Sequence, residues 1–270
     1  MHLQLAGHTA VIVGGARGIG LAIAWEFAKE SAHVALVDRA PEVMEVASAI
    51  ANEKQFSSAR PYQVDATDYN VLQQTARQIR DDFGRIDHLV FAVGVGSGKF
   101  GFPFWNLQPS DWPRVLEVNV MGAVNTLHAF VPHLIEAKDA TVLLISSIAG
   151  QIGSQTDPPY SAAKAALINF AQCAAKDLAP HNVRVNTLCP GMVQTALNRA
   201  VWQAWHDQQP EDKRQSYEEW TAEKIRKVVP LNRWQEPEDM AALAVFLASP
   251  RAKNICGQTL NVDGGFVMHW

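Results

Sequence analysis

Short runs of apolar and β-branched residues recur along the 270-residue chain, and most are apolar at nearly every position. A strand that is apolar throughout, rather than at alternate positions, is typical of a parallel sheet covered by helices on both faces. Six such runs occupy residues 9–13, 33–37, 86–93, 141–145, 183–188 and 259–262, and residues 60–64 form a weaker seventh. The sequence therefore predicts a parallel β-sheet of about seven strands.

Segments with helical spacing separate these runs. Ile19, Ile23 and Phe27 recur every four residues directly after the first run and form one apolar stripe. Further helices are predicted over residues 70–83, 109–134, 161–178 and 237–247. This alternation predicts right-handed crossovers and an α/β, doubly wound Rossmann-type fold, with residues 1–270 in one domain.

The segment 196–234 interrupts the pattern because it has no strand signal. It contains half of the eight tryptophans, namely Trp202, Trp205, Trp220 and Trp234. We interpret it as a helical insertion over the substrate site. Its tryptophans could stack on a bound sugar ring or could pack against the rest of the protein, and both interpretations stay open.

Composition excludes several other classes of protein. The net charge of −4 offers no basic surface for nucleic acid, and no apolar run approaches the roughly 18 residues of a membrane span. The N-terminal residues lack the features of a signal peptide, so a cytoplasmic protein is expected. Cys173, Cys189 and Cys256 have no metal-binding spacing, so neither a disulfide framework nor a metal site is predicted. Cys189 is expected to be a buried structural thiol.

A glycine-rich turn lies between the first predicted strand and the first predicted helix. Glycines there allow backbone N–H groups to approach a pyrophosphate, and the helix N-terminus adds favourable partial positive charge. The position of the turn, more than its composition, makes it a nucleotide-binding signal. The residues expected at the cofactor are Gly14, Arg17, Gly18, Ile19 and Gly20.

Asp38 stands at the end of the second run, near the spacing of about 20 residues expected for an acid that binds ribose. A carboxylate there accepts hydrogen bonds from the ribose hydroxyls of NAD and repels the 2′-phosphate of NADP. Arg17 and Arg39 could pair with that phosphate. NAD is therefore the expected cofactor, with NADP as the alternative.

Tyr160 and Lys164 are one helical turn apart and would share a helix face. A free tyrosine titrates near 10, but a lysine cation and the nicotinamide charge beside it would favour the phenolate. Such a tyrosine could take a proton from an alcohol while hydride leaves the same carbon. Ser147 follows the predicted strand 141–145, and with the glycine-rich turn it turns a weak two-residue signal into a specific one.

With these motifs in this order, the chain resembles the single-domain branch of the short-chain dehydrogenase/reductase family. The likeness covers nearly the whole chain except the tryptophan-rich segment and the extreme ends. The family's Thr-Gly-x-x-x-Gly-x-Gly matches residues 13–20, with Val13 in place of the threonine. Residues 91–94, Phe-Ala-Val-Gly, replace the family's Asn-Asn-Ala-Gly, so two asparagine side chains are missing.

The resemblance implies roles for individual residues. Tyr160 would be the general base in oxidation and the acid in reduction, and Ser147 would hydrogen-bond the reacting oxygen. Lys164 would lower the tyrosine pKa and hold the nicotinamide ribose, and Asn119 would support a water that connects Lys164 to solvent. The other cofactor contacts that the resemblance implies are Asp65 at the adenine, Ala66, Gly94, Pro190 and Gly191, with Val193 and Thr195 at the nicotinamide carboxamide.

The loop 94–105 and the insertion 196–234 should line the substrate pocket. Aromatic side chains mixed with amides and cations suit a sugar, acid sugar or polyol, which we take as the expected substrate class. Lys99 and Arg199 could meet an acidic group, and Gln155 is a third candidate. Reduction of a 3-oxoacyl thioester with NADPH and non-catalytic nucleotide binding are the alternatives. The resemblance also implies a homotetramer built through residues 111–134 and 160–178 and the C-terminal strand.

Overall fold

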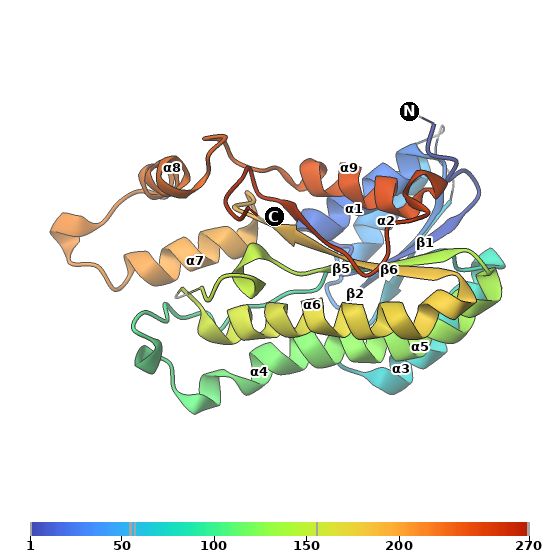
Figure 1. Ribbon diagram of the computed structural model, residues 1–270, viewed down its shortest axis with the longest axis horizontal. Coiled ribbons are helices and arrows are strands. Elements are labelled where there is room, and N and C mark those ends of the chain that lie inside the picture. The colour runs from blue at the N-terminus through green and yellow to red at the C-terminus, as the bar shows by residue number, and fades with distance from the viewer. Residues whose placement is uncertain (1, 54–55, 57, 155, 269–270) are drawn as a thin grey trace.

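The computed structural model of the protein describes residues 2–53, 56, 58–154 and 156–268. Seven strands form one parallel sheet in the order β3-β2-β1-β4-β5-β6-β7 (Figure 1). The strands are β1 (Thr9–Val13), β2 (His33–Asp38), β3 (Ala59–Gln63), β4 (His88–Phe91), β5 (Ala140–Ile145), β6 (Val183–Pro190) and β7 (Thr259–Val262). The strand order reverses between β1 and β4, and ligands bind outside the carboxyl ends of the strands at such a point. The predicted seven-stranded Rossmann-type sheet is confirmed.

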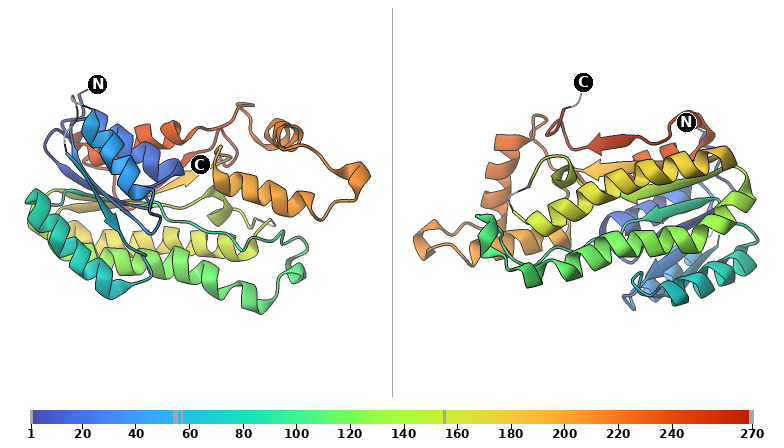
Figure 2. Two further views of the ribbon diagram at one scale, coloured as in Figure 1. Left: turned by 180° about the vertical axis from the view of Figure 1, so that it is seen from behind. Right: turned by 60° about the horizontal axis from the view of Figure 1, so that its bottom comes forward.

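Helices cover both faces of this sheet. α1, α2 and α9 lie on one face, and α3, α5 and α6 lie on the other (Figures 1 and 2). The helices are α1 (Gly18–Lys29), α2 (Val43–Asn52), α3 (Tyr69–Phe83), α4 (Pro113–Leu116), α5 (Gly122–Ala137), α6 (Pro158–Leu178), α7 (Ala196–His206), α8 (Tyr217–Val228) and α9 (Pro237–Ala248). α2 is missing from the sequence-based prediction.

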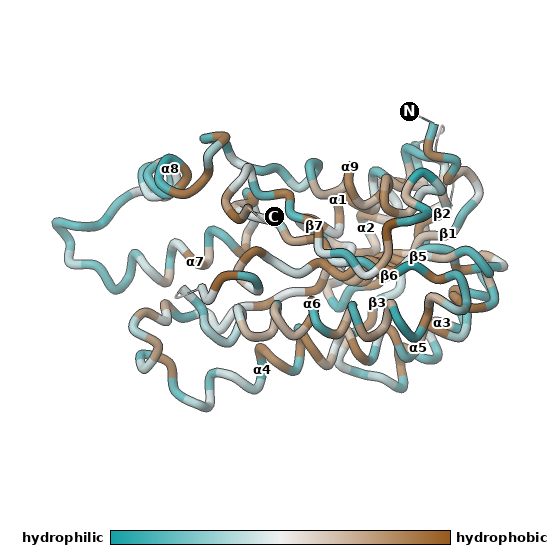
Figure 3. The backbone as a smooth tube through the Cα atoms, in the orientation of Figure 1, coloured by the Kyte–Doolittle hydropathy of each residue, from teal (hydrophilic) through white to brown (hydrophobic). Residues whose placement is uncertain are grey.

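The two helical layers explain why the central strands are apolar at nearly every position. In β1, Ala10 and Ile12 pack into the core beneath α1 and α9. Val11 and Val13 point the other way, into the core beneath α3, α5 and α6. Figure 3 shows the resulting concentration of apolar residues along the central strands. Because both faces are buried, no position along the strand can be polar without losing solvation.

The predicted helix over 109–134 is wrong in its continuity. A short 3-10 turn at Pro109–Asp111 and the four-residue α4 come first, and a π-helical segment, Glu117–Met121, then leads into α5. A π-helical turn holds one more residue than an α-helical turn, and such turns occur often at functional sites. Here it contains Asn119, whose side chain is completely buried.

The segment 196–234 forms the expected helical insertion. It contains α7, a short 3-10 turn at Glu211–Lys213 and α8. α7 and α8 extend away from the sheet at one end of the molecule (left in Figure 1). Within the described ranges, no helix has the length and apolar character needed to span a membrane.

A buried histidine lies at the amino end of the sheet, away from the carboxyl ends of the strands. His88 is 2% exposed, and its two ring nitrogens lie 3.0 Å from His8 Nδ1 and 2.9 Å from Thr141 Oγ1. Burial holds the pKa of His88 well below its ordinary value, and charge on His8, Arg184 or Arg85 would lower it further. The folded protein therefore keeps this ring neutral.

Acid should consequently destabilise the fold through His88. Below a pH of about 6.5 the unfolded chain binds a proton at this ring that the folded chain does not. The free energy of unfolding therefore decreases as the pH is lowered below about 6.5, and above that pH His88 has no effect on it. Between pH 7.5 and pH 5.5 the free energy of unfolding should lose about 1 kcal/mol from this group. Urea unfolding at both pH values measures the loss, which should disappear in His88→Asn. The exposed His128→Asn is the control, and an unchanged loss in His88→Asn contradicts the assignment.

Candidate active site

A cleft of about 320 Å³ lies at the carboxyl ends of the strands β1 to β6. Its walls come from the glycine-rich turn, the residues that follow β2 to β6, and the first turns of α6 and α7. The predicted site residues that line it are Gly14, Arg17, Gly18, Ile19, Asp38, Asp65, Ala66, Gly94, Ser147, Tyr160, Lys164, Pro190, Gly191, Val193 and Thr195. Gly20 and Asn119 lie behind this lining.

The glycine-rich turn between β1 and α1 has no room for side chains. A Cβ atom on Gly20 would lie 2.0 Å from the carbonyl oxygen of Gly14. A Cβ atom on Gly14 would lie 2.9 Å from the backbone after β4, at a φ of +91° that favours glycine. The backbone therefore passes close to its neighbours and presents N–H groups at the N-terminus of α1. This cradle fits the diphosphate of a dinucleotide.

Asp38, the last residue of β2, is tied to this turn. Its Oδ2 atom accepts a hydrogen bond of 3.0 Å from the N–H of Ala16, and its Oδ1 atom accepts one of 3.0 Å from the N–H of Ala40. The carboxylate lines the cleft at the same time. Asp38 thus braces the glycine-rich turn, a structural role that the sequence did not indicate, and still faces the position expected for a ribose.

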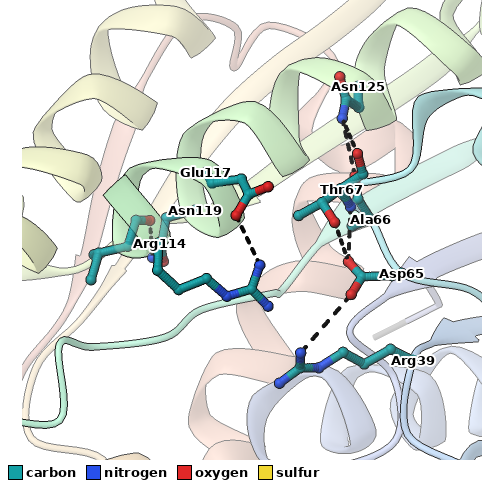
Figure 4. Close-up of polar contacts among 9 residues, drawn as sticks. Arg39, Asp65, Ala66, Thr67, Arg114, Glu117, Asn119 and Asn125 are labelled. Carbon is teal, nitrogen blue, oxygen red and sulfur yellow. Dashed lines mark hydrogen bonds and ion pairs between the residues drawn. The ribbon is translucent and has the colours of Figure 1, made fainter. Parts of the chain in front are cut away.

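Asp65 lies beyond the end of β3, at the same end of the cleft (Figure 4). Its Oδ1 atom accepts hydrogen bonds from the N–H of Thr67 (2.9 Å) and from the Thr67 hydroxyl (2.8 Å). Partial burial alone would raise the pKa of Asp65, but these hydrogen bonds and nearby arginines bring it below its ordinary value. Asn125 donates to the carbonyls of Ala66 and Thr67 and holds this turn in place.

Three guanidinium groups surround this end of the cleft. Arg39 lies 3.9 Å from Asp65, and Arg114 pairs with Glu117 at 3.0 Å (Figure 4). Arg17 is exposed at the glycine-rich turn and lines the cleft with them. Carboxylates that suit ribose hydroxyls and cations that suit a phosphate therefore lie side by side.

Lys164 lies on the floor of the cleft, on α6, and is 2% exposed. Its Nζ atom donates hydrogen bonds to the carbonyls of Ile145 (2.9 Å) and Val93 (3.4 Å), at the ends of two strands. Asn119 holds the neighbouring loop, because its Nδ2 atom donates to the carbonyls of Val95 and Val115, both at 2.8 Å. Gly94 passes between them, and a Cβ there would lie 3.3 Å from Nζ.

Tyr160 and Ser147 complete this cluster. The Nζ atom of Lys164 lies 5.5 Å from the centroid of the Tyr160 ring, as the spacing of one helical turn predicts. The Ser147 hydroxyl forms a hydrogen bond with the Tyr160 phenol. It also accepts a hydrogen bond of 3.1 Å from the N–H of Ala149, which fixes its direction.

The phenol of Tyr160 is hard to ionise in the chain alone. The expectation was that Lys164 together with the nicotinamide charge favours the phenolate. Without the dinucleotide, burial raises the pKa of Tyr160 to about 12, against the lowering effect of the Ser147 hydrogen bond. Burial also lowers the pKa of Lys164 to about 8. The chain without a cofactor therefore keeps the phenol protonated at neutral pH.

The loop after β5 packs directly on the backbone of α6. A Cβ on Gly150 would lie 2.6 Å from the carbonyl carbon of Lys164. The Ser146 hydroxyl donates to the Lys164 carbonyl (2.7 Å), and the Ser161 hydroxyl donates to the Ala149 carbonyl (2.5 Å). These contacts set the distance between Ser147 and Tyr160, and sequence reasoning missed all three residues.

Comparisons with known proteins agree with this geometry. A family model described as enoyl-(acyl carrier protein) reductase matches residues 14–267. The chain belongs to the short-chain dehydrogenase/reductase family. It is 29% identical to 3-oxoacyl-[acyl-carrier-protein] reductase FabG of Thermotoga maritima over 268 residues, which is 98% of this chain and 100% of that protein.

Two solved structures of this family are similar over almost their whole length. L-sorbose reductase from Gluconobacter frateurii, complexed with NADPH and L-sorbose, has a TM-score of 0.89 and 30% identity and covers 100% of both chains. NAD⁺-bound xylitol dehydrogenase has a TM-score of 0.89 and 26% identity, over 97% of this chain and 100% of that one. The protein is therefore an oxidoreductase of the short-chain dehydrogenase/reductase family. The two solved relatives hold different dinucleotides, NADPH in one and NAD⁺ in the other.

Asp157 is a further residue of this dehydrogenase that sequence reasoning missed. It occupies the N-cap position of α6, three residues before Tyr160, without a side-chain capping hydrogen bond, and is 8% exposed. Its Oδ2 atom accepts a hydrogen bond of 2.7 Å from the N–H of Ser97, so it connects α6 to the loop after β4. Burial raises the pKa of Asp157, and its charge contributes to the raised pKa of Tyr160.

Cys189 lies beside the same cluster but is a buried structural thiol, as predicted. It is fully buried in β6. Burial raises its pKa to about 11, against hydrogen bonds with Ser146 and Ser147, so it stays neutral and unreactive at physiological pH. Among the described residues, no group of three or more histidines, cysteines and acids is placed to hold a metal ion.

Two of the three residues proposed from sequence to bind substrate, Lys99 and Arg199, do not line the cleft. Lys99 forms an ion pair with Asp111 at 2.8 Å, and Arg199 lies 4.6 Å from the ring centroid of Tyr217. Neither lines the cleft. Gln155 lies outside the described residues. Both cations contact partners more than ten residues away in the sequence, and no local pattern predicts these contacts.

The tryptophans of the insertion also lie away from the cleft lining. Trp205 packs on Trp220 with ring centroids 6.0 Å apart, and the indole N–H of Trp202 donates to the carbonyl of Gln215. Their contacts join α7 to α8. The structure therefore favours the packing interpretation over direct stacking on a sugar.

Proposed function

We propose that this protein interconverts a secondary alcohol and a carbonyl on a polyol or sugar, with NAD as the preferred dinucleotide. The observation that carries the proposal is the cluster of Ser147, Tyr160 and Lys164 at one end of a cleft. The glycine-rich backbone cradle lies in the wall of the same cleft. A proton donor and a dinucleotide site in one cleft are what alcohol oxidation requires.

The bound dinucleotide would supply the group that accepts or donates hydride. The chain would hold it through the backbone of Gly14 and Gly18, through the carboxylate of Asp38 and through the turn at Pro190–Gly191. A Cβ at Gly191 would lie 2.7 Å from Asp263 Cα, which keeps that turn close to β7. Val193 and Thr195 would complete the contacts at the nicotinamide end.

Proton transfer would fall to Tyr160, which takes a proton from the alcohol in oxidation and returns it in reduction. Ser147 would hold the reacting oxygen within reach of the phenol. Lys164 would bind the ribose and supply positive charge beneath the ring, which lowers the cost of the phenolate. Asn119 would keep the carbonyl of Val95 turned toward it and leave a path for water to Lys164.

The substrate class rests on the solved relatives. L-sorbose reductase and xylitol dehydrogenase, each with a TM-score of 0.89, have a ketose and a polyol in their names. The cofactor proposal rests on Asp38 at the end of β2. The three arginines at the same end of the cleft are the reason to test NADP beside NAD.

A second candidate is the reduction of a 3-oxoacyl thioester with NADPH. The Thermotoga maritima relative of that name, and Arg17, Arg39 and Arg114 at the cleft, favour it. Asp38 and the net charge of −4 oppose it, because an acidic carrier protein and a 2′-phosphate both require positive partners.

A substrate screen tests these candidates. The formation of reduced dinucleotide would be followed by its absorbance at about 340 nm. NAD and NADP would each be tested with polyols, sugars, acid sugars and simple secondary alcohols. The reverse direction would use ketoses and an acetoacetyl thioester. A signal from polyols or ketoses that is largest with NAD or NADH supports the proposal. Activity confined to the thioester with NADPH establishes the second candidate and contradicts the first.

The homotetramer stays a proposal that rests on family resemblance. It would form through α5, α6 and the C-terminal strand β7. Light scattering of the purified chain gives its mass directly and distinguishes four copies from one.

A further inference from the structure

Among the described residues of α7 that line the cleft, Asn198 is the polar one after the N-cap Thr195. The others, Ala196, Leu197 and Val201, are apolar. The N–H of Asn198 is bound by the Thr195 hydroxyl at 3.4 Å, so Asn198 belongs to the fixed first turn of the helix. A single polar group among apolar ones is how a pocket typically orients a ligand.

The orientation of the Asn198 amide is set by a residue from α8. The Tyr217 hydroxyl donates a hydrogen bond of 3.1 Å to the Oδ1 atom of Asn198. Because the amide oxygen is engaged, the Nδ2 atom retains its two N–H donors, and it has no hydrogen-bond partner in the described part of the chain.

Tyr217 is itself held rigidly. Its side chain is 7% exposed, and its ring stacks on Trp234 at 6.2 Å and meets the edge of Trp202 at 5.7 Å. The guanidinium of Arg199 lies 4.6 Å from the ring centroid. The aromatic cluster of the insertion therefore holds Tyr217 in place, and Tyr217 in turn orients the Asn198 amide. This role does not involve stacking on a sugar.

We propose that Asn198, aimed by Tyr217, donates a hydrogen bond to a neutral oxygen of the substrate that is not the reacting oxygen. This inference rests on the proposed function, which it extends to a substrate class: neutral polyhydroxylated molecules. The group at the cleft is an uncharged donor, and the nearby cations Lys99 and Arg199 are engaged with Asp111 and Tyr217. An acid sugar would need one of those cations in the cleft.

The test compares two alcohols of the same carbon number. Xylitol carries further hydroxyls beside the reacting carbon, and 2-pentanol carries none. The wild-type enzyme should prefer xylitol. Asn198→Leu keeps the approximate size of the side chain and removes its polar atoms, so a substrate hydroxyl can neither donate to it nor accept from it. The substitution should lower kcat/KM for xylitol about tenfold, mainly through KM, because one hydrogen bond is lost. For 2-pentanol the value should stay within about twofold.

Tyr217→Phe provides the second variant, because it keeps the packed ring and removes the hydroxyl. It should lower the preference for xylitol by about threefold, since the amide loses its orientation but remains present. Gln203→Ala is the matched control, because Gln203 is an exposed amide on α7 that pairs with Asp207 outside the cleft. NADH affinity, measured by fluorescence, should be unchanged in all three variants.

The outcomes separate the inference from the function. Equal losses for xylitol and 2-pentanol in Asn198→Leu overturn the inference, because a merely structural residue gives that result. Weaker NADH binding with an unchanged preference also overturns it and assigns Asn198 to the dinucleotide. If the wild-type enzyme turns over no polyol or ketose at all, the proposed function falls and the inference falls with it.

Discussion

Replacing Tyr160 by phenylalanine should abolish turnover and leave dinucleotide binding intact. The substitution removes only the phenol oxygen and keeps the ring, which lies 5.5 Å from the Nζ atom of Lys164. Without the hydroxyl, the cluster loses the group that the proposed mechanism assigns to proton transfer. Loss of general acid–base catalysis typically costs between about 10² and 10⁴ in rate.

The measurement is the rate of reduced dinucleotide formation with the best substrate of the screen, together with NADH affinity by fluorescence. Tyr69→Phe is the matched control, because Tyr69 is a tyrosine on the surface of α3, outside the cleft. If Tyr160→Phe retains more than about a tenth of the wild-type rate, Tyr160 is not the proton-transfer group.

The second large effect is expected at Gly20. A methyl carbon there would lie 2.0 Å from the carbonyl oxygen of Gly14, which is too close for two heavy atoms that are not bonded to each other. The glycine-rich turn or the start of α1 must therefore move. Backbone N–H groups would then leave the position of the diphosphate. Gly20→Ala should weaken dinucleotide binding and lower kcat/KM by about a hundredfold.

Binding of NADH, followed by fluorescence, checks this expectation, and thermal unfolding shows whether the variant is folded. The control is Gly153→Ala, because a Cβ at Gly153 meets no atom within 4 Å. Normal affinity in a folded Gly20→Ala protein contradicts the assignment of this turn to the diphosphate.

The raised pKa of Tyr160 changes how the catalytic cluster should be understood. Burial raises the pKa to about 12, and Lys164 is itself weakened as a cation by a pKa of about 8. Without its dinucleotide, the cleft therefore favours a neutral phenol, and Tyr160 should then be a poor base at neutral pH. Asp157 contributes to this, because its charge lies near the phenol.

The strands and the proximity of Tyr160 and Lys164 could be predicted because both depend on local pattern. A strand buried on both faces is apolar at every position, and Tyr160 and Lys164 are neighbours on any α-helix. The glycine-rich turn was identifiable for the same reason, since only glycine fits where backbone meets backbone.

The sequence could not reveal which polar side chains of the loop 94–105 and of the insertion reach the cleft. Lys99 pairs with Asp111 and Arg199 contacts the ring of Tyr217, although both cations belong to segments that border the site. Asn198, which lines the cleft, was only one of several polar residues in the insertion. Long, flexible side chains can contact residues that are distant in the sequence, and such contacts leave no local pattern.

Local pattern along the chain was sufficient for the architecture and for the spacing of Tyr160 and Lys164, because both follow from periodicity. The glycine-rich turn was predicted from its place between a strand and a helix, and the role of Ser147 rested on the family resemblance. The packing of distant segments decided the rest. It buried Asn119 in a π-helical turn, pressed Gly150 onto α6, raised the pKa of Tyr160 and aimed Asn198 through Tyr217. Each of these depends on contacts between elements far apart in sequence, which exist only once the chain has folded.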